Sequence, residues 1–227
     1  MIKANYYIDF EKFTLIKFRT IIEQSELLPS RKIIQSNLIA NFEKIAEQKI
    51  SNLFDLQKSL KTKDKIYKFA KETGISENYL TILIREINSY QPTPVNFNDF
   101  PILSKVTIDK LQLANIKNTA NLFDKVISKT NRVQISSDLD INSDEILELT
   151  KLTDLVRIKW IGPIFACMFL NTGVDTSQKV SISNSTDLYN MLLDINKNNR
   201  FTKAKFQESD VSLCINVAKE VPKIIEY

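Results

Sequence analysis

Few side chains in this sequence could do chemistry, because it contains no histidine. Without imidazole there is no Ser-His-Asp or Cys-His nucleophile and no zinc site that needs a histidine. The two cysteines, Cys167 and Cys214, stand far apart in apolar stretches, so we expect buried thiols and no disulfide or metal cage. The sequence also lacks a carboxylate pair in an apolar setting and a glycine-rich phosphate loop. It therefore predicts a protein that is not an enzyme and has no catalytic residue, metal or cofactor.

One acidic segment has part of a calcium-binding pattern. Oxygen-bearing side chains alternate at every second position between residues 138 and 144, as at the start of a calcium loop. Ser143 replaces the glycine that such a loop needs for its sharp turn, and Leu149 replaces its bidentate glutamate. We therefore interpret Asn142 as a helix N-cap, with Glu145 as its capping-box partner.

Residues 155–174, LVRIKWIGPIFACMFLNTGV, could bind an anion. An apolar helix end meets Ile161, Gly162 and Pro163, and a second helix then runs to Gly173. Proline suits the first turn of a helix, where its missing N–H costs nothing. The first amides of a helix lack internal acceptors and lie at the positive end of the helix dipole, so they favour a phosphate.

This segment resembles the helix-hairpin-helix motif, whose tight turn presents backbone amides to a nucleic-acid phosphate without reading the base sequence. With the following residues GVDTSQKV and the repeats described below, nearly the whole chain resembles an uncharacterised bacterial family of tandem helix-hairpin-helix-like repeats. The resemblance implies amide donors near Gly162 and Ile164, with Arg157 and Lys159 as nearby cations.

The segment departs from the motif at one position. Such turns carry two glycines around an aliphatic residue, but Trp160 stands where the first glycine would be. Its indole could stack on a base or could fill a groove between repeats. Counting back twelve residues from Ile50, Ile116 and Val174, which end the closing turns of the three copies, gives Leu38, Ser104 and Gly162. Only the third copy therefore keeps a turn that suits a phosphate.

Basic residues are concentrated in two runs, although the chain carries only 31 Lys and Arg against 27 Asp and Glu. The first run comprises Lys58, Lys61, Lys63, Lys65, Lys68 and Lys71, around the single acid Asp64. The second comprises Lys197, Arg200, Lys203 and Lys205, with no acid between them. Either run could neutralise phosphates, or could simply be the solvated face of a helix.

An internal repeat organises the sequence. ISNLFD at residues 50–55 matches IKNTANLFD at 116–124, and a more divergent copy begins near Val174. Pairing Leu53 with Leu122 gives a period of 69 residues and pairing Ile75 with Ile141 gives 66, as if one copy had lost three residues. Periods of this length are typical of stacked helical units.

Each copy can be interpreted as a helix end followed by a closing turn. A β-branched residue (Ile50, Ile116 or Val174) returns to the core, and a polar N-cap (Ser51, Thr119 or Thr176) starts the next helix. The residue before the β-branched one is Gly173 in the third copy and Asn115 in the second, both of which tolerate the left-handed conformation. The first copy has Lys49 there, so we expect it to close differently.

The fold class follows from these patterns. With 3 glycines and 6 prolines the chain cannot build many tight turns, and its apolar periodicity is helical. We expect an all-α protein of tandem helix-hairpin-helix-like repeats in two units: residues 1–90 with the first repeat and 100–227 with the second and third, joined by a proline-containing linker at 91–99. No signal peptide or membrane span is visible, which predicts a cytoplasmic protein that does not bind membranes.

Two functions remain open at this point. The first is nonspecific nucleic-acid binding by the third hairpin, with DNA favoured over RNA. Its site residues would be Arg157, Lys159, Trp160, Gly162, Ile164, Lys197, Arg200, Lys203 and Lys205. The second is an adaptor that uses the same repeats to bind an unidentified protein and does not bind nucleic acid.

Overall fold

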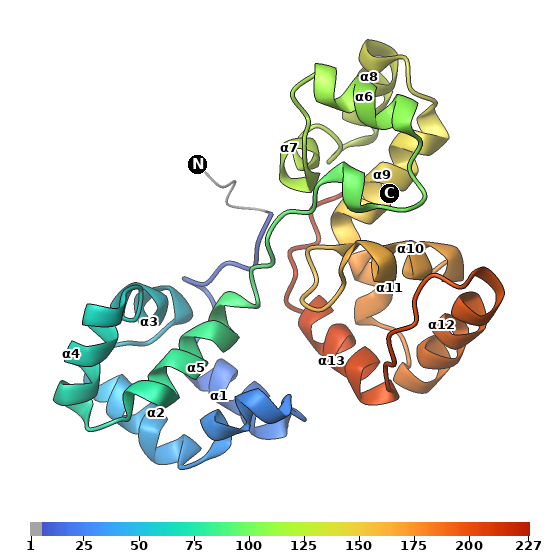
Figure 1. Cartoon of the computed structure of the whole chain (residues 1–227). Coiled ribbons are helices and arrows are strands. Elements are labelled where there is room, and N and C mark those ends of the chain that lie inside the picture. The colour runs from blue at the N-terminus through green and yellow to red at the C-terminus, as the bar shows by residue number, and fades with distance from the viewer. Residues whose placement is uncertain (1–5) are drawn as a thin grey trace. The chain divides into compact units, whose positions relative to one another are not determined.

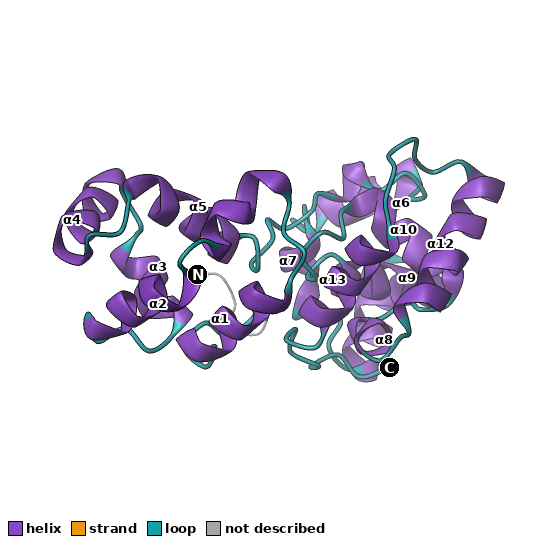
Figure 2. Ribbon diagram, turned by 90° about the horizontal axis from the view of Figure 1, so that it is seen from below, coloured by secondary structure: helices purple, strands orange, loops and turns teal. Residues whose placement is uncertain are grey.

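The computed structural model describes residues 6–227, which form helices joined by loops and turns (Figures 1 and 2). Within this range the only bridges between extended segments are the isolated pairs Thr14–Asn52 and Asn96–Asn118. The all-α prediction is therefore confirmed. None of the described helices has the length and apolar character needed to span a bilayer. The chain divides into two compact units, Ile8–Gln91 and a larger one that joins Tyr6 and Tyr7 to Pro92–Tyr227.

The smaller unit contains α1 (Leu15–Gln24), a 3-10 helix η1 (Pro29–Gln35), α2 (Leu38–Glu47), α3 (Leu53–Ser59), α4 (Lys63–Thr73) and α5 (Glu77–Asn88). Helix α5 packs on η1, α3 and α4, and α1 packs on α2. The core is aromatic at its centre, where Phe13, Phe18 and Tyr90 contact one another edge to face.

The larger unit begins with η2 (Phe97–Asp99). It continues with α6 (Lys105–Leu113), α7 (Thr119–Phe123), α8 (Lys129–Leu139), α9 (Ser143–Leu155), α10 (Pro163–Thr172), α11 (Ser177–Ser181), α12 (Ser185–Asn199) and α13 (Glu208–Ala218). Helix α9 packs on α7, α8 and α10, while α12 packs on both α10 and α13. Both cysteines are free and buried, which confirms the prediction for these thiols.

Side-chain N-caps start most of the helices. The capping residues whose side chains accept an amide hydrogen include Asn52, Thr62, Ser76, Ser104, Asn118, Ser128, Asn142, Thr176 and Asn184. The predicted N-cap Thr176 is confirmed, whereas Ser51 and Thr119 each lie one residue from the true cap. Asn142 caps α9 as predicted, but its presumed partner Glu145 instead accepts a hydrogen bond from Thr107.

The caps also test the spacing that was predicted between the sequence copies. Asn52 and Asn118, Thr62 and Ser128, and Ser76 and Asn142 are all separated by 66 residues. The 69-residue pairing of Leu53 with Leu122 is therefore wrong by about one helical turn. The error arose because both segments contain the sequence NLFD. A leucine at either of two core positions one helical turn apart gives the same local sequence pattern.

Left-handed residues end helices at corresponding places in the chain. Lys49, Asn115 and Gly173 have φ of 61°, 59° and 78°, each directly before a β-branched residue. Ile50 and Ile116 are buried as predicted, whereas Val174 is only half-buried. A second set, Gly74, Asp140 and Arg200, has φ of 68°, 49° and 53° at the ends of α4, α8 and α12. The expectation that the copy containing Lys49 closes differently is therefore wrong. Its turn has the same left-handed backbone conformation as the other copies, and here a lysine is strained in it.

Asn115 offers a test of this closure, because it is exposed and makes the left-handed turn before buried Ile116. Asn115→Ala should lower the free energy of unfolding by about 1 kcal/mol relative to Asn115→Gly, since only alanine carries a Cβ that crowds the turn. Urea unfolding followed by far-ultraviolet circular dichroism measures the difference. Equal stability of the two variants would show that the turn does not need this conformation.

Candidate functional site

The turn between α9 and α10 is a tight hairpin anchored by two isoleucines. The amide of Ile158 donates to Leu155 and the amide of Ile161 donates to Ile158, and both isoleucine side chains are buried. Between them Trp160 has φ of 76°, the left-handed conformation that a glycine would adopt at lower cost. The turn thus contains a residue in a glycine-like conformation, and that residue is a tryptophan.

The N-terminus of α10 presents unused hydrogen-bond donors. Its N-cap is Gly162, which has no side chain to accept a hydrogen bond, and Pro163 has no amide hydrogen. In the part of the chain that the structure describes, the amides of Gly162, Ile164 and Phe165 have no acceptor. The Ile164 side chain beside them is exposed. These amides, at the positive end of a ten-residue helix, can donate to an anion.

Arg157 does not serve as a surface cation, which corrects the role predicted for it. It is only 2% exposed. Its guanidinium donates to Asp154 Oδ1 at 2.6 Å, to the Tyr6 carbonyl at 2.9 Å and to the Pro222 carbonyl at 2.8 Å. The Phe123 ring lies 4.6 Å from its central carbon. Arg157 therefore joins three distant segments of the larger unit and has no free face for a phosphate.

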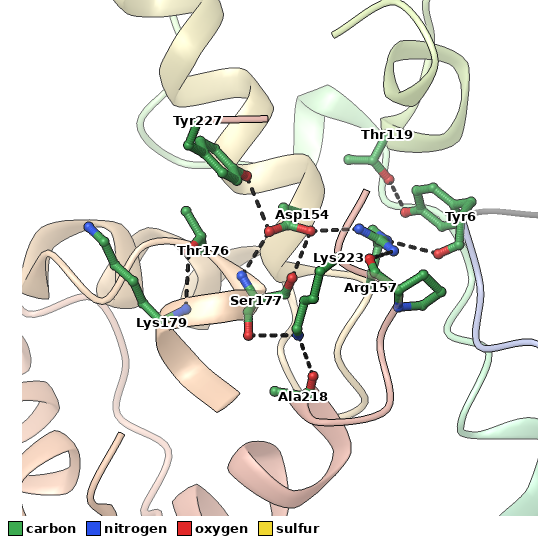
Figure 3. A network of polar contacts seen from close by, with 11 residues as sticks. Tyr6, Thr119, Asp154, Arg157, Thr176, Ser177, Lys179, Ala218, Lys223 and Tyr227 are labelled. Carbon is green, nitrogen blue, oxygen red and sulfur yellow. Dashed lines mark hydrogen bonds and ion pairs between the residues drawn. The ribbon is translucent and has the colours of Figure 1, made fainter. Parts of the chain in front are cut away.

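Asp154 is the centre of this buried network (Figure 3). Besides Arg157, it accepts hydrogen bonds from the Ser177 amide at 2.8 Å, the Ser177 hydroxyl at 3.0 Å and the Tyr227 hydroxyl at 3.1 Å. Burial lowers the pKa of Arg157, although the carboxylate acts in the opposite direction. Burial, together with the same carboxylate, raises the pKa of Tyr227. The sequence contained one local signal for the pair, a carboxylate three residues before an arginine at an apolar helix end.

Lys159 is also buried, at 4% exposure, so it is not the accessible cation that was predicted. Its ammonium lies 4.9 Å from the centre of the Trp160 ring, a cation–π contact. Its carbonyl accepts a hydrogen bond from the Cys214 thiol. The Trp160 residue itself is 43% exposed. Lys159 thus supports one side of an indole that still meets solvent.

The second basic run is accessible and approaches the hairpin. Lys197, Arg200, Lys203 and Lys205 are all exposed. The Asn196 side chain exchanges two hydrogen bonds with the Thr202 backbone, which holds the loop after α12. The next aromatic residue, Phe206, packs edge to face on Phe165 in the first turn of α10, with ring centres 5.3 Å apart. This contact ties the residue that follows Lys205 to the first turn of α10.

Comparison with known proteins assigns a family to this chain. Residues 101–221 match a family described as a domain of unknown function (DUF4332). The match covers more than half of the chain and includes α6 to α13, so the protein belongs to this family. This agrees with the resemblance to an uncharacterised family that the sequence indicated. Neither the curated proteins nor the solved structures provided a match.

The buried ion pair predicts a large loss of stability when it is broken from one side. Asp154→Ala leaves the Arg157 charge without its carboxylate in the core, and should lower the free energy of unfolding by about 3–5 kcal/mol. Urea unfolding measures the loss. The control Asp109→Ala breaks an exposed pair with Lys105 and should cost less than about 1 kcal/mol. Comparable losses in the two variants would contradict a central role for Asp154.

Lys223 predicts a dependence of stability on pH. Its ammonium donates to the Ser177 and Ala218 carbonyls, and burial lowers its pKa from 10.5 to about 8, against the opposing effect of Asp154. Between these two pKa values the unfolded chain binds more protons, so stability should rise with pH. We expect the unfolding free energy, relative to Lys223→Met, to increase from pH 7.5 to 9.5. A flat or falling difference would exclude the lowered pKa.

Proposed function

We propose that the larger unit is a non-enzymatic, cytoplasmic nucleic-acid-binding module that contacts the sugar-phosphate backbone, with double-stranded DNA as its main ligand. One observation supports the proposal: the first amides of α10 have no acceptor among the described residues, and the contact between Phe165 and Phe206 ties the end of an exposed basic loop to the same helical turn. A phosphate could accept hydrogen bonds from the Ile164 and Phe165 amides while neighbouring lysines neutralise the adjacent phosphates.

This proposal changes the roles of the residues around the turn. Arg157 fixes the shape of the hairpin from inside, and Lys159 supports the indole of Trp160. The exposed cations are Lys197, Arg200, Lys203 and Lys205. Contacts of this kind would be independent of base sequence, and Trp160 could stack on a base where a strand is open.

The charge of the unit sets the expected strength of binding. Residues 92–227 carry 16 Lys and Arg against 16 Asp and Glu, so the unit as a whole does not attract a polyanion. No acidic residue lies between positions 195 and 207. Binding must therefore depend on this local run, and removing two of its charges should have a large effect.

An adaptor function is the second candidate, and the turn itself provides the observation that favours it. Trp160 and Ile164 are both exposed and apolar, and they lie four residues apart at the tip of one hairpin. Aromatic residues of this kind anchor many protein interfaces. An adaptor would use these side chains and would not need the lysines of the loop.

The nucleic-acid proposal predicts a specific salt dependence. Lys203→Glu with Lys205→Glu should weaken binding to a fluorescent 20-base-pair duplex by about ten-fold or more, and should reduce the slope of log affinity against log salt by about 2. Fluorescence anisotropy between about 20 and 200 mM salt measures both quantities. Lys125→Glu with Lys129→Glu, an equal charge change at exposed lysines elsewhere in the unit, should have a much smaller effect.

Two results decide between the candidates. If the unaltered protein shows no salt-sensitive duplex binding, or if both double variants lose the same affinity, the nucleic-acid proposal is wrong. Trp160→Gly removes the indole and suits the left-handed turn, so the protein stays folded. If the unaltered protein does not bind the duplex, and this variant no longer captures a partner protein that the unaltered protein captures, the adaptor function is favoured.

A further inference from the structure

We propose that the smaller unit, Ile8–Gln91, carries a second nucleic-acid surface, which binds a single strand along two adjoining grooves beside α3. The inference rests on the proposed function for its class of ligand, and it adds a strand type and a separate set of residues. It also assigns a role to the first lysine run, which the hairpin does not use. The tests below distinguish its failure from failure of the hairpin proposal.

The first groove lies between the end of α2 and the helices α3 and α4, and has a volume of about 500 Å³. Its charged lining residues are Lys49, Asp55, Lys58, Lys65, Lys68 and Glu72. All four lysines are exposed, so their ammonium groups can approach a ligand without rearrangement of the core. The groove therefore combines a concave shape with an excess of positive charge, and both features favour a polyanion.

The lysines of this groove are only partly neutralised by the protein. Lys68 lies 3.8 Å from Glu72, and Lys65 donates to the Lys58 carbonyl. The ammonium groups of Lys49 and Lys58 have no hydrogen-bond or ion-pair partner in residues 6–227. Positive charges gathered without partners repel one another, and a bound chain of phosphates would remove that repulsion.

Lys49 supplies an independent reason to assign a function to the groove. Its φ of 61° is left-handed, at the position where Asn115 and Gly173 close the corresponding helices. A lysine in this conformation is strained, and its exposed side chain does not contribute to the core. Such strain is typically kept where the residue serves a ligand, and here the lysine lines the groove.

The second groove shows why the ligand should be an extended strand. It has a volume of about 430 Å³ and shares Lys58 with the first groove, so the two adjoin at α3. It adds Lys61 and the ring of Phe54, which is 42% exposed. Cations that follow a backbone, next to an aromatic ring on which a base can stack, are typical of single-strand binding. A stiff duplex cannot follow two concave surfaces in this way.

The experiment uses the full chain and a fluorescent twenty-nucleotide oligothymidylate. Lys49→Gly with Lys58→Gln should weaken binding about ten-fold at low salt and reduce the salt slope by about 1.4, the value for two phosphate contacts on a single strand. Lys49→Gly also relieves the left-handed strain, so the thermal midpoint should rise while affinity falls. This combination excludes misfolding as the cause of the loss.

Two further variants test the placement of the strand. Lys63→Gln with Lys71→Gln changes the charge of α4 equally at exposed lysines that line neither groove, and it should retain most of the affinity. Phe54→Ala should weaken binding by at least about five-fold with an unchanged salt slope, because it removes stacking and no charge. Equal losses from the two lysine pairs, or no loss from Phe54→Ala, would overturn the inference.

The hairpin variants separate the two proposals. If Lys203→Glu with Lys205→Glu weakens duplex binding while the groove variants bind oligothymidylate normally, the proposed function stands and this inference is wrong. If the groove variants lose oligothymidylate binding while the hairpin variants bind the duplex as tightly as the unaltered protein does, this inference stands and the hairpin proposal fails.

Discussion

The buried pair of Asp154 and Arg157 is the interaction on which the larger unit depends. Each charge would be costly in the core alone, and each is satisfied by several partners from distant segments. The guanidinium holds the Tyr6 and Pro222 carbonyls, while the carboxylate holds the start of α11. Arg157 lies two residues beyond the end of α9, so this network holds the start of the hairpin turn.

That arrangement explains which parts of the site the sequence could predict. The turn and the free amides of α10 could be predicted from local residue types. A glycine followed by a proline is typical of a helix start that has no side-chain cap. The burial of Arg157 does not, because it depends on Tyr6, which lies 151 positions away in the sequence. From the sequence alone, a cation beside a hairpin is expected to bind a phosphate. Only the tertiary contacts show that the Arg157 guanidinium is already engaged by groups within the protein.

The fold shows the same division between local and distant information. Polar caps and the scarcity of glycine predicted an all-α chain, and Asn115 and Gly173 predicted left-handed closures because both residue types tolerate them. Lys49 and Trp160 adopt that conformation although their types disfavour it, so no local rule could find them. Both strained residues belong to surfaces with proposed ligands, where departures from local preference are expected.

The exposed indole in the hairpin turn has a practical consequence, because it is the only tryptophan of the chain. Its emission comes from the tip of the turn alone, so the intact protein contains its own optical reporter at the proposed contact. A nucleobase stacked on the ring would quench the light, whereas an apolar protein surface would shift it to shorter wavelengths. The spectrum of the unlabelled protein can therefore distinguish the two kinds of partner.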